Sequence, residues 1–218
     1  MAEHQSIFQR PQRGTRGPTP SHSREEIVEA AVALADADGL AAVSMRAVAA
    51  RLGTAAGSLY RYLSSRDDLL DLMSDAVVAE LRPFPSAADP LDALVAVARA
   101  QLAMHQRHPW LTEAIQHSSG LGPNSLAYFD HCLGVVAPLS CPVTARFEAI
   151  AMLTGIVTLF ARRQPQAGGF AGLDFTPYPN LVAAMTSAAT DPAAQQDQDL
   201  FERTIRAVLS GLLRGSDQ

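Results

Sequence analysis

Hydrophobic residues recur every three or four positions along most of the chain, which is the spacing of one face of a helix. The first stripe begins after a capping box formed by Ser23 and Glu26 and ends at Gly39; it consists of Ile27, Ala30, Ala31 and Leu34. No stretch alternates polar and apolar residues over the length of a strand, and no internal repeat is present. The pattern therefore predicts an all-α protein.

Three short helical segments follow this stripe. We expect helices over residues 44–52 and 54–63, and a third helix that begins after a cap at residue 65. Gly53 separates the first two and supplies the left-handed backbone conformation that a tight turn needs. Two short helices joined in this way are typical of a helix-turn-helix, whose second helix enters the major groove of DNA. Residues 21–68 are therefore predicted to form a three-helix DNA-binding domain.

Residues 69–218 are also predicted to be helical. Helices are expected over residues 89–106, 109–118, 125–137, 142–163, 181–189 and 200–213. The helix at 142–163 is apolar nearly all round, and the helix at 200–213 carries an apolar stripe with spacings of four, three and four. Both are candidates for a homodimer interface, with the core of a single subunit as the alternative.

The charge of the chain is unevenly distributed. The net charge of the 218 residues is −5, yet residues 1–66 hold eight arginines and six acids, and residues 40–66 hold four arginines and no acid. A local basic patch binds a polyanion even where the whole chain is acidic. All 17 basic residues are arginine, which excludes Schiff-base chemistry on a lysine and the lysine of a Walker loop.

Gly53 and Gly57 raise the alternative of a phosphate-binding loop in an enzyme. Their spacing fits neither a Walker loop nor a dinucleotide fingerprint, and a predicted helix, rather than a strand, precedes them. The sequence also lacks a G-x-S-x-G elbow, an H-E-x-x-H motif and a Cys/His zinc cluster. The absence of these motifs favours a DNA-binding protein over an enzyme, and no cofactor is predicted.

The segment VSMRAVAARLGTAAGSLYRYLSSRDDLLDLM resembles the N-terminal DNA-binding domain of the tetracycline-repressor (TetR) family of bacterial transcription regulators. The resemblance extends over about residues 23–75. The segments RHPWL (107–111) and GPNSL (122–126) are similar to one class of TetR effector domains. The chain departs from the family pattern at Thr54, where valine or isoleucine is usual, and at Tyr62, where histidine is usual.

The resemblance implies a set of DNA contacts. Two residues at helix starts would bind phosphates, two tyrosines would hold the DNA backbone, three small residues would face bases, and two arginines would reach base edges or phosphates. These are Ser44 and Arg66; Tyr60 and Tyr62; Ala56, Gly57 and Ser58; and Arg46 and Arg61. Tyr60 as a packing residue and Arg61 as a solvent-exposed side chain are the alternatives.

The same resemblance implies a homodimer that binds a palindromic operator on double-stranded DNA and is released by a small hydrophobic or aromatic effector. Candidate residues of the effector pocket are His105, Trp110, Phe129, Met152, Phe160 and Phe175, each of which would also serve in an ordinary core. Release by a protein partner without a small ligand is the alternative mechanism. His105 and His108 lie three residues apart, but no acid or cysteine is near them in sequence, so no metal site is predicted.

Residues 1–20 are rich in Arg, Pro, Gly and Gln and are expected to be a disordered tail. Arg10, Arg13 and Arg16 recur every three residues, so a DNA minor-groove arm is the alternative to a solvated tail. No secretory signal is recognised, and the longest charge-free apolar stretch of helical character, 149–161, is shorter than the roughly 20 residues of a bilayer span. We therefore expect a cytoplasmic protein without a membrane partner, in which Cys132 and Cys141 are buried, reduced thiols.

Overall fold

The computed structural model describes residues 6–10, 22–117, 120–162, 173–190 and 200–214. All regular structure in these ranges is helical, which confirms the predicted all-α class. The elements are η1 (Ile7–Gln9), α1 (Arg24–Asp38), η2 (Leu40–Ala42), α2 (Met45–Arg51), α3 (Ala56–Leu59), α4 (Arg66–Val78), η3 (Ala79–Leu81), α5 (Pro90–Arg107), α6 (Leu111–Gln116), α7 (Pro123–Val136), α8 (Val143–Ala161), α9 (Pro179–Thr190) and α11 (Leu200–Leu213).

Local capping sets the start of several of these helices. Ser23, Ser44, Ser65 and Asp89 precede α1, α2, α4 and α5, and each side chain accepts a hydrogen bond from the backbone N–H three residues further on. At α1 the bond is reciprocal, because the Glu26 carboxylate accepts from the N–H of Ser23 at 2.8 Å. These bonds satisfy amides that a helix leaves free at its first turn, so the starts could be predicted from local sequence.

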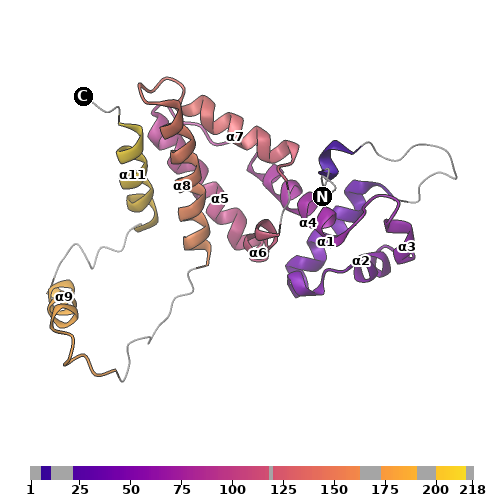
Figure 1. Cartoon of the computed structure of the whole chain (residues 1–218), viewed down its shortest axis with the longest axis horizontal. Helices are drawn as coiled ribbons and strands as arrows, with labels where there is room; N and C mark the ends of the chain where they lie inside the picture. The colour runs from indigo at the N-terminus through magenta and orange to yellow at the C-terminus, as the bar shows by residue number, and fades with distance from the viewer. Residues whose placement is uncertain (1–5, 11–21, 118–119, 163–172, 191–199, 215–218) are drawn as a thin grey trace, which may run out of the picture.

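Helix α4 joins two parts of the molecule (Figure 1). On one side α1, η2, α2 and α3 form a small cluster around α4, and on the other side α6 and α7 pack against it. The boundary that we expected between residues 68 and 69 therefore falls inside a continuous helix. Helix α4 therefore has contacts in both parts of the molecule.

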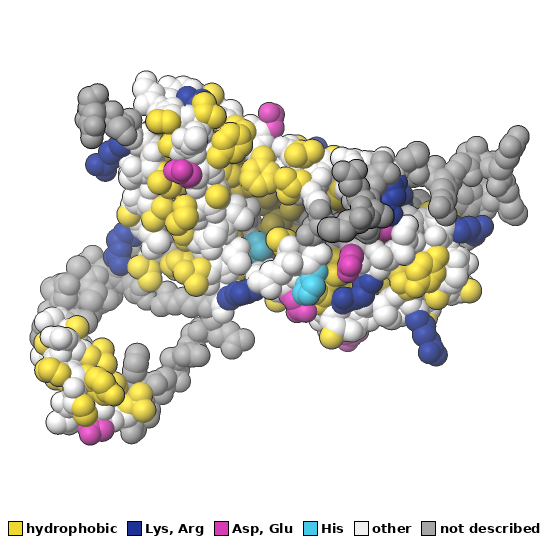
Figure 2. Space-filling view, viewed as in Figure 1, with side chains coloured by type: hydrophobic (Ala, Val, Ile, Leu, Met, Phe, Trp, Pro, Cys, Tyr) yellow, Lys and Arg dark blue, Asp and Glu magenta, His cyan; other side chains and the backbone are white. Residues whose placement is uncertain are grey.

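Helix α8 lies at the centre of the second part, where it packs against α5, α7 and α11. Its inward face is buried, but its outward face exposes Val143, Phe147, Met152 and Leu159, with 46–68% of each residue accessible. Figure 2 shows hydrophobic side chains gathered along this helix. By length and composition alone α8 could cross a membrane, although it carries Arg146 and Glu148 and packs against three other helices on one side.

Helix α9 lies apart from the other described helices (Figure 1). Its apolar side chains Leu181, Val182 and Met185 are each about two-fifths exposed, at 39–42%. Phe175, in the segment that precedes α9, lines an open groove together with Val182 and Met185. These side chains are thus left largely uncovered in a single chain.

The expectation of a disordered tail does not hold for residues 6–10. Ile7 in η1 is 2% exposed and belongs to the core, and Arg10 makes a bidentate ion pair with Asp68 at 2.7 and 2.9 Å. The carboxylate of Asp68 is itself nearly buried, so the pair anchors this segment firmly to the start of α4. Arg13 and Arg16 lie outside the described residues, so the arm alternative stays a prediction for them.

The two cysteines differ in their surroundings. Cys132 in α7 is fully buried, as expected, whereas Cys141, in the connection between α7 and α8, is partly exposed. Both are free thiols. The expectation of burial therefore fails for Cys141, because it lies beyond the end of α7 rather than on the inner face of a helix.

Candidate nucleic-acid interface

The turn between α2 and α3 has the geometry that the sequence predicted. Gly53 adopts φ +67°, in the left-handed region that favours glycine. The amide of Thr54 donates to the carbonyl of Ala49 at 2.9 Å, which closes the end of α2. Beyond the turn, Leu59 and Leu63 are 0% and 2% exposed and fix the second helix of the unit to the core. The opposite face of α3 is therefore directed outward in a defined orientation.

Six of the predicted DNA-contacting residues are exposed in and beside the helix-turn-helix. They are Ser44 and Arg46 at the start of α2, Gly57 in α3, Tyr60 and Arg61 just after it, and Arg66 at the start of α4. Tyr60 is 53% exposed, which is high for a tyrosine and argues against a packing role. Ala56 and Ser58 are partly buried.

Gly57 is not required by the packing of the chain itself. A Cβ atom built at this position has no heavy atom within 4 Å, and the backbone is not in the left-handed region. A glycine in a helix costs about 0.5–1 kcal/mol relative to alanine. The packing of the chain therefore gives no reason for glycine at this position.

Arg66 and Tyr62 are engaged within the protein. The Arg66 guanidinium donates from Nε to the carbonyl of Val43 at 3.1 Å and from Nη2 to the carbonyl of Leu40 at 3.2 Å. It thereby fixes the segment that leads into α2. The hydroxyl of Tyr62 is buried without a hydrogen bond, so it is not presented to solvent as Tyr60 is.

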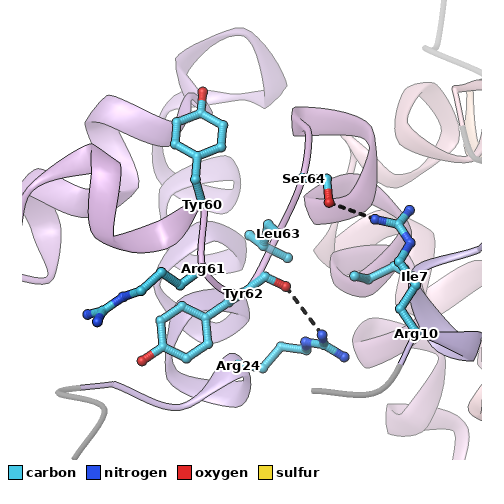
Figure 3. A pocket seen from close by; sticks show the side chains of 8 residues that line it. All are labelled: Ile7, Arg10, Arg24, Tyr60, Arg61, Tyr62, Leu63 and Ser64. Atoms are coloured by element: carbon cyan, nitrogen blue, oxygen red, sulfur yellow. Dashed lines mark hydrogen bonds between the residues drawn. The ribbon is translucent and has the colours of Figure 1, made fainter. Parts of the chain in front are cut away.

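A cavity of about 70 Å³ lies at the edge of this surface, between the N-terminal segment, the start of α1 and residues 60–64 (Figure 3). It is lined by Ile7, Arg10, Arg24, Tyr60, Arg61, Tyr62, Leu63 and Ser64. The Arg24 side chain reaches the backbone there, where its Nη2 donates to the carbonyl of Tyr62 at 3.2 Å. Sequence reasoning did not identify Arg24 as a functional residue.

The six residues predicted for an effector pocket lie in different places. His105 is buried at the end of α5 beside Thr112, Phe129 contacts Tyr128 within α7, and Phe160 meets Phe201 between α8 and α11. Met152 is exposed on α8, and Phe175 precedes α9. The contacts of these residues thus lie at different places in the second part, and their grouping in one effector pocket stays a prediction.

Trp110 contributes instead to a junction between the two parts of the molecule. Its Nε1 donates to Asp36 of α1 at 2.6 Å. The ring nitrogens of His108 lie 2.7 Å from Asp36 and 2.9 Å from Glu80 of η3. Burial by itself would raise the pKa of Glu80, but hydrogen bonds from Arg107 and His108 outweigh it and lower that pKa. Side chains of the RHPWL segment therefore bind the C-terminal turn of α1.

The GPNSL segment forms a second junction, with α4. The buried carboxylate of Asp75 accepts hydrogen bonds from the backbone amides of Asn124 and Ser125 at 3.2 and 2.8 Å. It also accepts from the side chains of the same two residues at 3.0 and 2.9 Å. Asp75 thus caps the first turn of α7, where the helix dipole favours a negative charge. The two short motifs were singled out from sequence only by their resemblance to TetR effector domains, and neither acidic partner was identified.

No group of three His, Cys, Asp or Glu side chains in the described ranges is arranged to hold a metal ion. Burial lowers the pKa of His105, and the nearby His108 adds to this effect, so the neutral ring is favoured. Its Nδ1 lies 3.1 Å from the hydroxyl of Thr112. The histidines of this region therefore take part in hydrogen bonds between helices.

The fold and this surface define a class of protein: a helix-turn-helix DNA-binding unit attached to a larger helical domain. Residues 27–73 match the family of bacterial regulatory proteins named for tetR. The crystal structure of ligand-free ActR from Streptomyces coelicolor superimposes with a TM-score of 0.74 and 26% identity, over 91% of this chain and 98% of that one. ActR bound to actinorhodin gives 0.73 and 27%, over 90% and 99%.

Within residues 27–73 the chain is thus similar to the tetR family of bacterial regulatory proteins. A repressor from Streptomyces coeruleorubidus, the HTH-type transcriptional repressor DrrR1, is 43% identical over 157 residues, which are 70% of this chain and 57% of that protein. The chain spans about half the length of the curated relatives that it matches, from 45% to 57%.

Proposed function

We propose that the protein is a transcriptional repressor that binds a palindromic operator as a homodimer and is released by a small aromatic effector. One observation carries the DNA-binding part: Leu59 and Leu63 are buried while Gly57, Tyr60 and Arg61 of the same short segment face solvent. Entry into a major groove requires a recognition helix that packs against the core on one face and is exposed on the other. Ser44, Arg46 and Ser58 complete the proposed contacts.

The dimer is supported by the uncovered face of α8. Val143, Phe147, Met152 and Leu159 are all about half exposed or more, and they extend along one helix. An exposed stripe of this kind costs free energy in water and is typical of an interface. A second copy of the chain related by a twofold axis would cover it and would present two reading helices to two operator half-sites.

The effector is supported by unpaired polar atoms inside the second part. Gln101 Oε1 on α5, the Tyr128 hydroxyl on α7 and Thr154 Oγ1 on α8 are buried without a hydrogen bond. Burial raises the pKa of Tyr128 well above its usual value, and Thr154 is close enough to offset part of this effect. The side chains of Tyr128 and Thr154 nevertheless do not form a well-aligned hydrogen bond. Buried polar atoms of this kind require partners. A ligand with aromatic rings and hydrogen-bonding substituents would supply them.

Crystal structures of ActR have been solved in complex with actinorhodin and with (S)-DNPA. Actinorhodin is therefore a rational first probe for this chain. Binding would raise the midpoint of thermal unfolding in proportion to the logarithm of ligand concentration above Kd, and it would reduce the affinity for operator DNA.

The DNA-binding proposal is tested by selecting bound fragments from a random duplex library and measuring affinity for the recovered site. A palindrome is expected, and the Arg46→Ala/Tyr60→Ala variant should bind it at least tenfold more weakly. Wild-type affinity in that variant would refute the assignment of the reading surface. If no compound in a broad aromatic panel stabilises the protein while operator binding is intact, release by a protein partner becomes the better explanation.

A further inference from the structure

The cavity beside the α3–α4 connection has an excess of positive charge. In Figure 3 the side chains of Arg10 and Arg24 lie on one side of residues 60–64, and those of Arg61 and Tyr62 lie on the other. Among the residues that the structure describes, none that lines the cavity is acidic, whereas Arg10, Arg24 and Arg61 all line it. The cavity therefore favours an anionic ligand.

Arg10 and Arg24 differ in how their charges are balanced. Arg10 forms a bidentate pair with Asp68 and a further hydrogen bond with Ser64 at 2.8 Å. Within the described part of the chain, Arg24 meets only the neutral carbonyl of Tyr62, and its Nε is buried without a hydrogen-bond partner. A partly buried guanidinium without a counter-ion is unfavourable, and its planar set of donors matches the oxygens of a phosphate.

The position of the cavity indicates where such a phosphate would come from. Tyr60 and Arg61, which line the same cavity, belong to the exposed surface that is proposed to meet DNA. The cavity is large enough for several water-sized atoms. We propose that Arg24 is a DNA-binding residue that holds one backbone phosphate of the duplex at this cavity. The inference rests on the proposed DNA-binding function and adds a contact outside the helix-turn-helix itself.

Phosphate contacts are read from the salt dependence of binding, because each one releases counter-ions from DNA. The full-length chain and the Arg24→Gln variant are titrated with a short duplex of arbitrary sequence at several NaCl concentrations. The plot of log affinity against log salt is expected to be shallower by about one in the variant. The loss of affinity should be similar on any sequence, because a phosphate carries no base information.

Two further variants make the result specific. Arg203→Gln removes the same charge from an exposed position of α11 and should leave the salt slope unchanged. Arg24→Lys keeps the charge but loses the planar donor set, so it should retain the slope with weaker binding. A purely structural role of Arg24 would lower the unfolding midpoint of Arg24→Gln without altering its slope.

The outcomes separate this inference from the function on which it rests. If the wild-type chain does not bind duplex DNA, the proposed function fails. If it binds and Arg24→Gln shows the wild-type slope, the Arg24 contact is refuted. Should the slope stay unchanged while inorganic phosphate at constant ionic strength raises the unfolding midpoint of the wild type but not of Arg24→Gln, the site binds free phosphate and the assignment to DNA is overturned.

Discussion

Substitution of Gly122 by alanine should strongly destabilise the junction between α4 and α7. A Cβ atom at this position would lie 2.2 Å from Cγ of Asp75 and 2.4 and 2.5 Å from its carboxylate oxygens, closer than non-bonded atoms approach. Asp75 is 5% exposed and its carboxylate accepts four hydrogen bonds from Asn124 and Ser125. The carboxylate cannot move away without losing some of them.

The magnitude follows from those bonds. A hydrogen bond to a charged group contributes about 1.5–3 kcal/mol, so loss of the two backbone bonds alone costs about 3 kcal/mol or more. For a chain of this size such a change lowers the midpoint of thermal unfolding by about 6–12 °C. Gly134→Ala in the same helix is the matched control, because a Cβ atom at Gly134 meets no atom within 4 Å. That variant should be as stable as the wild type or slightly more stable.

A double-mutant cycle tests the cause directly. Thermal and urea unfolding are measured for Gly122→Ala, Asp75→Ala and the double variant. Because alanine at position 75 has no carboxylate to collide with, the double variant should be as stable as Asp75→Ala alone. The two costs would then be strongly non-additive. Additive costs, or a Gly122→Ala variant with wild-type stability, would refute the collision as the reason for glycine at this position.

Three further predictions concern other sites. Gly57→Ala should raise the unfolding midpoint slightly but weaken DNA binding, because the methyl group meets no protein atom and faces the duplex; unchanged affinity would contradict the close approach. Iodoacetamide at about pH 8 should label Cys141 in the native protein and leave Cys132 unmodified until unfolding, since burial raises the pKa of Cys132 to about 11; mass spectrometry of native labelling decides this, and earlier labelling of Cys132 would contradict it. Burial lowers the pKa of His105 below its ordinary 6.5. The contribution of the neutral, buried imidazole to stability is therefore present above about pH 6.5 and is lost as pH falls through the pKa of the folded state. Between about pH 7.5 and about pH 5.5 the unfolding midpoint should therefore fall less in His105→Gln than in the wild type, and equal falls would count against this origin.

The effector pocket stays a prediction, and its six residues show what a sequence pattern leaves undetermined. Apolar and aromatic residues on predicted helices were chosen by type, but the rotation of each helix about its own axis decides which space a side chain faces. Trp110 binds Asp36 at the junction with α1, and Met152 is exposed on α8. The unpaired polar atoms of Gln101, Tyr128 and Thr154 carry no distinguishing pattern in the sequence, because a missing partner is a property of packing.

The sequence by itself determined the features that depend on neighbours along the chain. Serine and aspartate caps placed the starts of α1, α2, α4 and α5, and Gly53 placed the turn. The apolar pair Leu59 and Leu63 also indicated which side of the reading segment is buried, although Leu63 lies beyond the end of α3. All of these effects act within a few residues.

Only the tertiary structure decided which distant charged and polar groups meet. Asp36 and Trp110 are 74 residues apart, Arg10 and Asp68 are 58 apart, and Asp75 and Ser125 are 50 apart, yet each pair is joined by hydrogen bonds. Twenty-two acids and seventeen arginines allow many pairings, and the choice among them depends on the angles at which the helices cross. The same angles leave Arg24 without an acidic partner among the described residues, which is why its proposed role could be inferred from the structure and not from the sequence.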